Sequence, residues 1–542
     1  MGAGAGAGRR RRVAAGLLGA ALLTGGAALD GGGAYAAPSP GGHSTGSGDS
    51  NGHGNGDGNG NGNGNGNGNG DGRGGNDRDR DGAGRSPSPA GATTGTSKAA
   101  SHGAGSASPS PSAGRTAPPP AGLVLQPADG AAVGIPTVHG LQQALAAALQ
   151  DKSLGTVTLA VGDATSGQLL YGSGENTPAT PASTTKLATS LAALSLIPAD
   201  TRIATRVVRG AGAGDIVLVG GGDPTLTALP ADQVQIGGVA ADADTAPASL
   251  DALARQTAAA LRAAGAATVR LGYDTSLYTG SPQHANHDAA NIALVTPLMA
   301  DEGRADPKSR EEAPPRVADP AGAAAEQFAA LLRAQGITVE GRAKQVAAPA
   351  PAAAVLGQVE SPTLVRLVER LLTTSDNTLA EAVARQVALA AHKPASFEGA
   401  AAAVTQTLTG LGVQLTGVVL NDGSGLHPGN AIPPAVLLQL LGLASAPAHP
   451  ELRPVLTGLP IAGFTGTLGK RFGAASGSGE AAGIVRAKTG SLSGVNTLAG
   501  TVVDADGRLL SFAVMTRTTA AADTARAAMD RIVARLAACG CH

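Results

Sequence analysis

Aromatic residues are scarce in this chain, which has no Trp, four Tyr and five Phe among 542 residues. Proteins that hold single-stranded nucleic acid stack its bases on aromatic side chains, and platforms that stack sugars need aromatic rings as well. The formal net charge of −1 gives no electrostatic reason to expect a nucleic acid partner. The composition therefore favours a peptide-like substrate.

Cysteine is also nearly absent, because the chain has only Cys539 and Cys541, in a Cys-Gly-Cys-His tail. An exported protein without a disulfide framework must rely on its hydrophobic core. Two cysteines do not supply the four ligands of a structural zinc site. We predict a frayed tail without a metal or redox function.

The N-terminus has the pattern of an export signal. Arg9 to Arg12 form a basic region, Val13 to Leu29 form an apolar region, and Ala34-Tyr35-Ala36 offers a small-x-small cleavage site. The apolar run is short and contains glycines, which argues against a transmembrane helix. We predict a cleaved signal peptide at 1–36 and an extracytoplasmic protein, wall-associated or secreted. An uncleaved anchor is the alternative, and the export route stays open.

Residues 37–136 cannot build a core, since they consist of Asn-Gly repeats, an Asp/Arg patch and Ser/Pro runs. Such a composition is typical of disordered segments. We predict a linker that acts either as a tether through a cell wall or as inert low-complexity sequence.

Hydrophobic patterns resume near Thr137. A helix is expected at 141–149, a strand at 156–161 and a returning hairpin strand at 168–171, followed by an apolar helix that begins near Ser183. The order of helix, hairpin and helix suits an α/β serine-acyltransferase core.

Residues 200–359 differ in texture and are expected to form an inserted domain. Strands are predicted at 203–208, 216–219, 267–273 and 337–339, and helices at 250–264 and 321–334. A run of three glycines, Gly220 to Gly222, lacks the lysine of a phosphate-binding loop, so it indicates a turn. The trio His284, His287 and Asp288 resembles a metal-binding pattern, but its Pro- and Asn-rich loop favours solvated side chains.

The remaining chain is predicted to alternate helices with a terminal strand meander. Helices are expected at 364–372, 378–390, 397–411, 433–443 and 524–537, and strands at 418–420, 484–488, 498–503 and 509–515. We therefore predict five segments: signal peptide 1–36, linker 37–136, catalytic domain 137–199, inserted domain 200–359 and catalytic domain 360–538.

The string Ser183-x-x-Lys186 lies at the start of an apolar helix. Residues three apart share one helix face, so Lys186 is placed to take a proton from Ser183. The helix N-terminus also offers free N–H groups and partial positive charge to an oxyanion. Such strings are common by chance, however, and alone indicate little.

Two further segments make the signal specific. The chain contains, in this order, Ser183-x-x-Lys186, Ser375-Asp376-Asn377 and Lys488-Thr489-Gly490. This set resembles the three motifs of penicillin-binding proteins and class A β-lactamases.

The residue types fit acyl transfer. Ser183 is the expected nucleophile, and a serine hydroxyl needs a base. Lys186 can be that base when burial and the nearby cation Lys488 favour its neutral amine. Ser375 is expected to relay the proton, and Asn377 to hold the lysine and a substrate amide.

The third motif is expected to bind substrate. Lys488 and Thr489 can hold a free carboxylate, and Gly490 lets the substrate backbone lie close. The backbone N–H groups of Ser183 and Ser491 are expected to form the oxyanion hole. We expect Asp376 to anchor its loop.

Spacing indicates the subfamily. Ser375 follows Ser183 by 192 residues (375 − 183), too long an excursion for a compact β-lactamase, and no Glu-x-x-x-Asn element follows. Further markers are Asp422-Gly423-Ser424-Gly425-Leu426 and Gly466-Thr467-Leu468. From Thr137 to Leu536 the chain resembles the class C low-molecular-mass penicillin-binding proteins, the D-alanyl-D-alanine carboxypeptidase/endopeptidase family.

The resemblance implies an α/β (α+β) penicillin-binding, β-lactamase-like transpeptidase fold with a domain inserted between the first two motifs. Family members usually carry two inserted domains, whereas the insert here looks short. It also implies removal of the terminal D-Ala from peptidoglycan stem peptides, cleavage of peptide cross-links and acylation of Ser183 by β-lactams. No metal or cofactor is expected. The alternatives are a β-lactamase or esterase, and a wall-binding protein without catalysis.

Overall fold

The computed structural model describes residues 134–542 except 237, 289, 310, 312 and 350–352. The predicted signal peptide and nearly all of the predicted linker lie outside the described residues. Within the described part of the chain, no helix combines the length and apolar character needed to span a bilayer.

The catalytic motifs are organised by a five-stranded antiparallel sheet, which we call the catalytic sheet, with strand order β10-β11-β12-β1-β2. Its strands are β1 (Thr156–Asp163), β2 (Leu169–Ser173), β10 (Arg486–Leu492), β11 (Val495–Val503) and β12 (Leu509–Arg517). The N-terminal hairpin and the C-terminal meander, predicted separately, therefore join through the pairing of β1 with β12, which aligns Ala160 with Ala513.

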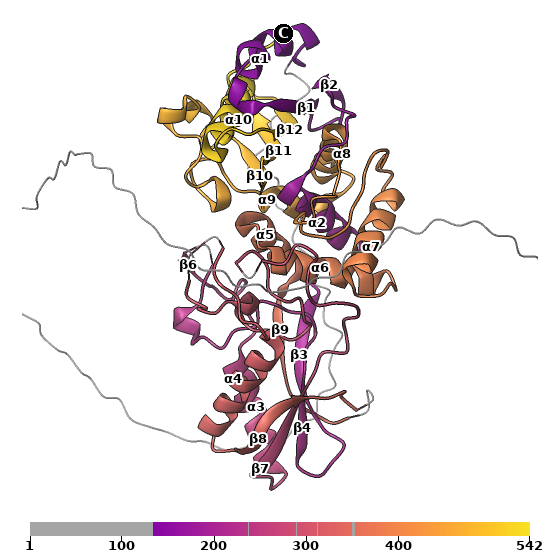
Figure 1. Ribbon diagram of the computed structural model, residues 1–542, viewed down its shortest axis with the longest axis vertical. Helices are drawn as coiled ribbons and strands as arrows, with labels where there is room; N and C mark the ends of the chain where they lie inside the picture. The colour runs from indigo at the N-terminus through magenta and orange to yellow at the C-terminus, as the bar shows by residue number, and fades with distance from the viewer. Residues whose placement is uncertain (1–133, 237, 289, 310, 312, 350–352) are drawn as a thin grey trace, which may run out of the picture. The chain divides into compact units, whose positions relative to one another are not determined.

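Helices cover both faces of the catalytic sheet. Helices α1 (Val138–Leu149) and α10 (Ala522–Ala537) lie on one face, and α8 (Pro434–Ser445) packs on the other (Figure 1). Alternate residues of a strand point to opposite faces. Leu159 accordingly joins the core beneath α1 and α10, while Ala160 joins the core on the opposite face, which includes residues of α2 and α8. The small alanine side chains leave room for helices to approach the sheet closely.

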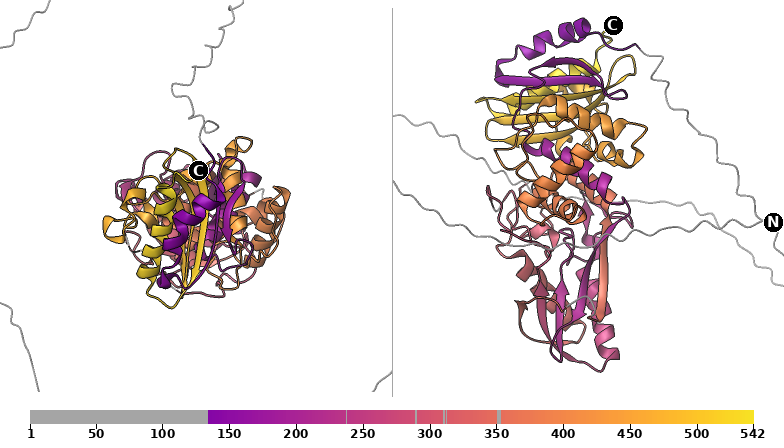
Figure 2. Two further views of the ribbon diagram at one scale, coloured as in Figure 1. Left: turned by 90° about the horizontal axis from the view of Figure 1, so that it is seen from above. Right: turned by 90° about the vertical axis from the view of Figure 1, so that its right-hand side faces the viewer.

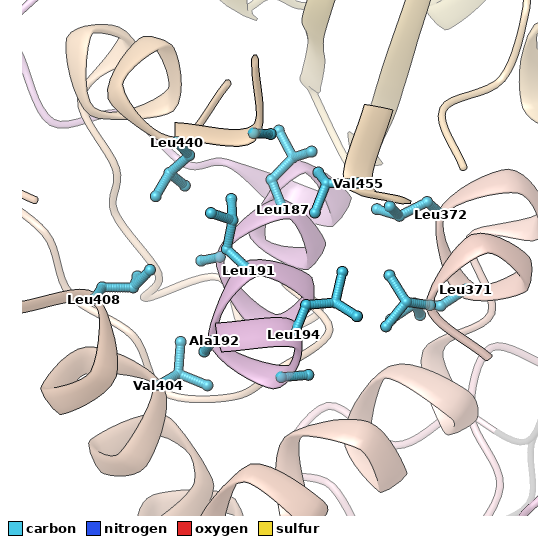
Figure 3. Packing of buried hydrophobic residues seen from close by; sticks show 14 of the residues in the cluster. Leu187, Leu191, Ala192, Leu194, Leu371, Leu372, Val404, Leu408, Leu440 and Val455 are labelled. Carbon is cyan, nitrogen blue, oxygen red and sulfur yellow. The ribbon is translucent and has the colours of Figure 1, made fainter. Parts of the chain in front are cut away.

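Helix α2 (Thr185–Leu196), which follows Ser183, is buried on nearly all sides. Leucine and alanine make up more than half of this helix, and such a helix belongs in a core. Figure 3 shows Leu187, Leu191 and Leu194 pointing toward leucines and valines of the surrounding helices. These helices include α5 (Leu364–Thr374), α6 (Asn377–Ala390), α7 (Phe397–Gly410) and α9 (Pro454–Thr457). At about 1.5–3 kcal/mol for each buried leucine, this packing holds the start of α2 firmly in place.

A second five-stranded sheet, which we call the insert sheet, has strand order β8-β7-β4-β3-β9. Its strands are β3 (Arg202–Arg209), β4 (Asp215–Val219), β7 (Thr268–Asp274), β8 (Thr338–Gln345) and β9 (Val355–Thr363). The pairs β4–β7 and β7–β8 are parallel, and the others are antiparallel.

Two amphipathic helices, α3 (Leu250–Ala263) and α4 (Pro320–Ala334), pack on one face of the insert sheet (Figures 1 and 2). Their N-termini are capped by Ser249 and Asp319, each of which accepts a backbone N–H three residues on. Between β7 and α4 runs a long loop, residues 275–319, which we call the insert loop.

Shorter elements complete the described chain: the strands β5 (Gln235–Ile236) and β6 (Val239–Ala240), and 3-10 helices at Lys152–Leu154, Ala182–Thr184 (η3), Ala231–Gln233, Asp301–Gly303, Pro450–Leu452, Gly466–Leu468, Ala474–Ser476 and Gly479–Ala481.

Three local predictions were wrong. The strand expected at 418–420 is only an isolated bridge between Val419 and Ala431, because a three-residue apolar run had no neighbouring strand to pair with. The strand expected to end at Lys488 runs on to Leu492. The tail is not frayed, since Cys541 O accepts the N–H of Thr137 at 2.7 Å and Cys539 O accepts the N–H of Ala505 at 3.2 Å. Cys539 and Cys541 form a disulfide with each other. The domain boundaries at 200 and 359 stay predictions.

Candidate active site

Ser183 lies in η3, the tight turn that leads into α2. The preceding Ala182 has a positive φ of 46°, a conformation that is unfavourable for alanine and needs support from its surroundings. That support includes Gly425, because a Cβ at this position would lie 1.8 Å from Ala182 O. The Asp422–Leu426 loop therefore packs directly against the turn that presents Ser183.

Lys186 follows Ser183 by one helical turn and is completely buried. Its Nζ donates hydrogen bonds to Ser183 Oγ at 2.8 Å, Asn377 Oδ1 at 2.7 Å and the Ser424 carbonyl at 2.7 Å. Burial lowers its pKa to about 8, against the opposing effect of three nearby carboxylates, Asp422 foremost. The amine can thus lose its proton near neutral pH while facing the serine hydroxyl.

Ser375 and Asn377 are presented by the break between α5 and α6. Ser375 has a left-handed backbone with φ of 60°, which turns the chain sharply. Asp376 caps α6 by accepting the N–H of Leu379 at 2.9 Å, and pairs with Arg316 at 3.1 Å. Burial raises the pKa of Asp376, but Arg316 and Arg304 lower it further, so the pKa lies below its ordinary value. The expectation that Asp376 anchors its loop agrees with these contacts.

The insert loop forms hydrogen bonds with the residues at this break. The Asn291 carbonyl accepts a hydrogen bond from Asn377 Nδ2 at 3.0 Å, and the N–H of Ala293 donates to Thr378 Oγ1 at 3.1 Å. Together with Arg316, these contacts fix Asn377 so that its Oδ1 faces Lys186.

Lys488 lies on β10, at the end of the strand order in the catalytic sheet. Its Nζ donates to Ser375 Oγ at 2.7 Å and to the Thr489 carbonyl at 2.8 Å. Thr489 Oγ1 is 2.8 Å from Thr467 Oγ1. This group of one cation and two hydroxyls beside a strand edge is suited to a carboxylate.

Gly490 is required by close packing. A Cβ here would lie 2.1 Å from Thr497 Oγ1, 2.7 Å from Pro181 O and 2.9 Å from Ser183 N. Strand β10 can approach the Ser183 turn only because residue 490 has no side chain. The sequence analysis explained this glycine by the substrate alone and did not predict the packing. Ser491 is exposed, and its Oγ accepts a hydrogen bond from Arg526 Nη2 at 3.1 Å.

The predicted site residues thus come together in two hydrogen-bonded groups. One joins Ser183, Lys186 and Asn377, and the other joins Ser375 and Lys488. A serine beside a buried amine of lowered pKa, with a second cation nearby, can perform nucleophilic acyl transfer.

Sequence reasoning missed the partners of these residues. It noted the segments that contain Ser424 and Thr467 as markers, but assigned them no contact. It did not consider Glu381, which is buried four residues after Asn377 and binds the N–H groups of Gly423 and Ser424.

His284, His287 and Asp288, which form a metal-like pattern in the sequence, do not gather at one site in the structure. His284 Nε2 lies 3.0 Å from Asp422 Oδ2, whereas Asp288 accepts the N–H of Ala290 within its own loop. In the described part of the chain, the metal-ligand type atoms that gather within 4.8 Å are those of His284, Glu381 and Asp422. We treat these side chains as a hydrogen-bonded network, because each already bonds to protein groups.

Comparison with known proteins decides the family. Residues 141–314 and 307–536 match the model of the D-Ala-D-Ala carboxypeptidase 3 (S13) family. The chain belongs to this family. The family that the sequence motifs predicted is thereby confirmed, and the chain is a serine-type D-Ala-D-Ala carboxypeptidase, among the low-molecular-mass penicillin-binding proteins.

Individual relatives agree with this membership. Carboxypeptidase DacB of Mycolicibacterium smegmatis is 37% identical over 436 residues, which cover 78% of this chain and 90% of the relative. A D-alanyl-D-alanine carboxypeptidase of an Actinomadura species is 29% identical over 434 residues, covering 68% and 79% respectively.

The crystal structure of penicillin binding protein 4 (dacB) from Haemophilus influenzae has a TM-score of 0.57 at 22% identity. The structural match covers 74% of this chain and 98% of the H. influenzae chain. The predicted penicillin-binding, β-lactamase-like fold class is confirmed by this likeness.

Proposed function

We propose that this D-Ala-D-Ala carboxypeptidase removes the terminal D-Ala from peptidoglycan stem peptides through an acyl-enzyme on Ser183. The single observation that carries the proposal is the 2.8 Å hydrogen bond between Ser183 Oγ and the buried Nζ of Lys186. Burial lowers the pKa of this amine to about 8, which makes it a base suited to neutral pH.

In the acylation step, neutral Lys186 takes the proton of Ser183 while Oγ bonds to the carbonyl carbon of the scissile amide. The backbone N–H groups of Ser183 and Ser491 hold the resulting oxyanion. As the intermediate collapses, the C–N bond breaks and the leaving D-Ala amine receives the proton through Ser375. Water then hydrolyses the ester and restores Ser183.

Substrate orientation comes from the strand edge. Lys488, Thr489 and Thr467 bind the terminal carboxylate of the stem peptide, whose backbone runs beside Gly490. A carboxylate met by a cation and hydroxyl groups forms charge-assisted hydrogen bonds. The same arrangement admits a β-lactam, whose carboxylate takes that position while its ring carbonyl faces Ser183. A relative of similar fold, the H. influenzae protein, has been crystallised with a β-lactam.

We further propose that the enzyme acts outside the cytoplasm, at the cell wall or secreted, since peptidoglycan lies there. The export signal predicted at residues 1–36 supports this location. Cleavage of peptide cross-links would use the same Ser183 chemistry on a longer leaving group.

The proposal is tested by intact mass after brief incubation with benzylpenicillin. We expect one drug adduct on the wild type and none on Ser183→Ala. Ser195→Ala is a matched control on the same helix, because Ser195 Oγ bonds only to the Ala192 carbonyl among the described contacts. It should label normally. Label that persists on Ser183→Ala would refute the assignment, and rapid drug hydrolysis without an adduct would indicate a β-lactamase.

A further inference from the structure

Glu381 is a buried carboxylate that the reaction described above does not use. It lies on α6 one turn after Asn377 and is fully shielded from solvent. Its Oε1 accepts the backbone N–H of Gly423 at 3.0 Å and that of Ser424 at 2.8 Å. Two charge-assisted bonds to consecutive amides fix the course of the backbone.

The backbone that Glu381 fixes reaches the catalytic lysine directly. The Ser424 carbonyl accepts the Lys186 Nζ at 2.7 Å, and the Gly423 carbonyl accepts Thr189 Oγ1 from the next turn of α2 at 2.6 Å. The Asp422–Leu426 loop therefore lies between two helices, bonded to α6 through its N–H groups and to α2 through its carbonyls. A shift of this loop would change the position of the Lys186 amine.

Asp422 ties the same loop to the insert. Its carboxylate accepts the N–H of Gly425 at 2.9 Å, the N–H of His427 at 2.7 Å and Asn430 Nδ2 at 2.7 Å, and lies 3.0 Å from His284 Nε2. Each carboxylate oxygen is thus held by at least two groups, so this side chain has little freedom to reorient.

Several charged groups surround Lys186. Negative charge comes from Asp422, Asp376 and Glu381, each of which raises the pKa of the lysine against the larger effect of burial. Basic groups face these carboxylates in turn: Arg385 lies 3.5 Å from Glu381, and Arg316 and Arg304 pair with Asp376. The His284 ring contacts Asp422, and Lys488 bonds to the hydroxyl of Ser375. Glu381 Oε2 accepts no hydrogen bond but lies 3.5 Å from Arg385 Nη1. Burial and Asp422 raise the pKa of Glu381, and Arg385 opposes them by favouring the carboxylate.

We propose that Glu381 is a positioning residue for acylation, which orients the Ser424 carbonyl toward Lys186 and adds its carboxylate to the negative groups around that amine. This inference rests on the proposed function, in which Lys186 activates Ser183. Glu381 touches neither the substrate nor the serine, so its influence passes entirely through the loop and the electric field at the lysine.

The proposal is tested by the pH dependence of the second-order rate of acylation by benzylpenicillin, normalised to acylatable sites. Glu381→Gln keeps an oxygen for both amides but removes the charge. We expect its rate–pH midpoint to fall by about one unit, with a plateau rate close to wild type. Glu381→Ala removes the acceptor too, and we expect a plateau at least about tenfold lower.

Glu398→Gln is the matched control, because it makes the same change beside the same Arg385, but at a carboxylate that accepts from Ser396 Oγ. Its midpoint should equal that of wild type. An unshifted midpoint in Glu381→Gln overturns the proposal, as does an unchanged plateau in Glu381→Ala. Should Glu381→Gln give no acylatable protein, Glu381→Asp, which keeps the charge on a shorter side chain, must lower the plateau without shifting the midpoint. Failure of the wild type to label at Ser183 would instead refute the proposed function.

Discussion

The two five-stranded sheets differ in how they are covered. In the catalytic sheet, every residue of β11 except Val503 is buried, because helices pack on both faces. In the insert sheet, Val339 is the only residue of β8 that is buried, because β8 is an edge strand and α3 and α4 cover one face alone. The comparison shows that equal strand numbers serve different purposes: the first sheet supports chemistry within a closed core, and the second presents an open face.

The site follows from this difference. Strand β10 brings Lys488 to the place where the covered sheet meets the helices around α2, and a deeply buried lysine is possible only in such surroundings. The insert contributes no strand residue to the predicted site. It reaches the site through its loop, by the Asn291 carbonyl, Arg316 and His284.

The largest difference between the two regions is expected for lysine substitutions. Lys186→Met removes the proposed general base and should slow acylation by about 10²–10⁴-fold. Lys344→Met replaces an exposed lysine of β8 and should leave the rate unchanged. Stopped-flow acylation with a chromogenic β-lactam measures both. Equal losses would contradict the division between a catalytic and a presenting sheet.

A buried ion pair should matter more than an exposed one. The side chains of Arg316 and Asp376 are 2% and 4% exposed. Arg316→Met leaves the buried carboxylate with only the more distant Arg304, at 3.5 Å, and should destabilise the protein by about 3 kcal/mol. Arg255→Met breaks an exposed pair with Asp251 on α3 and should cost about 0–1 kcal/mol.

Denaturant unfolding measures both changes in the free energy of unfolding. Acylation should also slow in Arg316→Met, because Asp376 caps the helix that begins at Asn377. A variant that loses stability without any loss of acylation would show that the insert loop does not support the site.

The pH dependence should distinguish the buried site from solvent-exposed groups. Since the pKa of Lys186 is about 8, about a tenth of the enzyme has a neutral lysine at pH 7. The acylation rate should therefore rise roughly tenfold from pH 7 to well above pH 8 and then level off. A rate that falls across this range would exclude a neutral Lys186 as the base.

The smallest effects are expected from single strand residues. Val514→Thr places a hydroxyl in the doubly covered β12 and should cost about 1–3 kcal/mol. Glu340→Thr lies on exposed β8 and should change the stability by no more than about 0.5 kcal/mol. Similar costs at both positions would mean that the open face of the insert sheet is covered in solution.

Sequence alone predicted the elements and the motifs well. The helix predicted at 141–149 occurs as Val138–Leu149, and the one at 250–264 as Leu250–Ala263, because hydrophobic periodicity is a local property of the chain. The three motifs pointed to acyl transfer, and their residues do meet. What each of them does in catalysis stays a prediction.

The supporting contacts could not be predicted in the same way. Glu381 bonds to amides 42 and 43 residues away, and His284 lies 138 residues before Asp422. No local pattern links such positions, since the partner depends on how the insert loop folds back onto the helices. Strand β9 was missed because its polar residues, such as Gln358 and Glu360, obscure the alternation.

The three hydrogen bonds of Lys186 have a consequence for folding. Its partners Asn377 and Ser424 are separated from it by 191 and 238 residues, so two long chain segments must close before the lysine is satisfied. Contacts of such high sequence separation tend to form late. Competence for acylation should consequently appear at the end of refolding, and covalent capture by a penicillin would count only those molecules that have completed it.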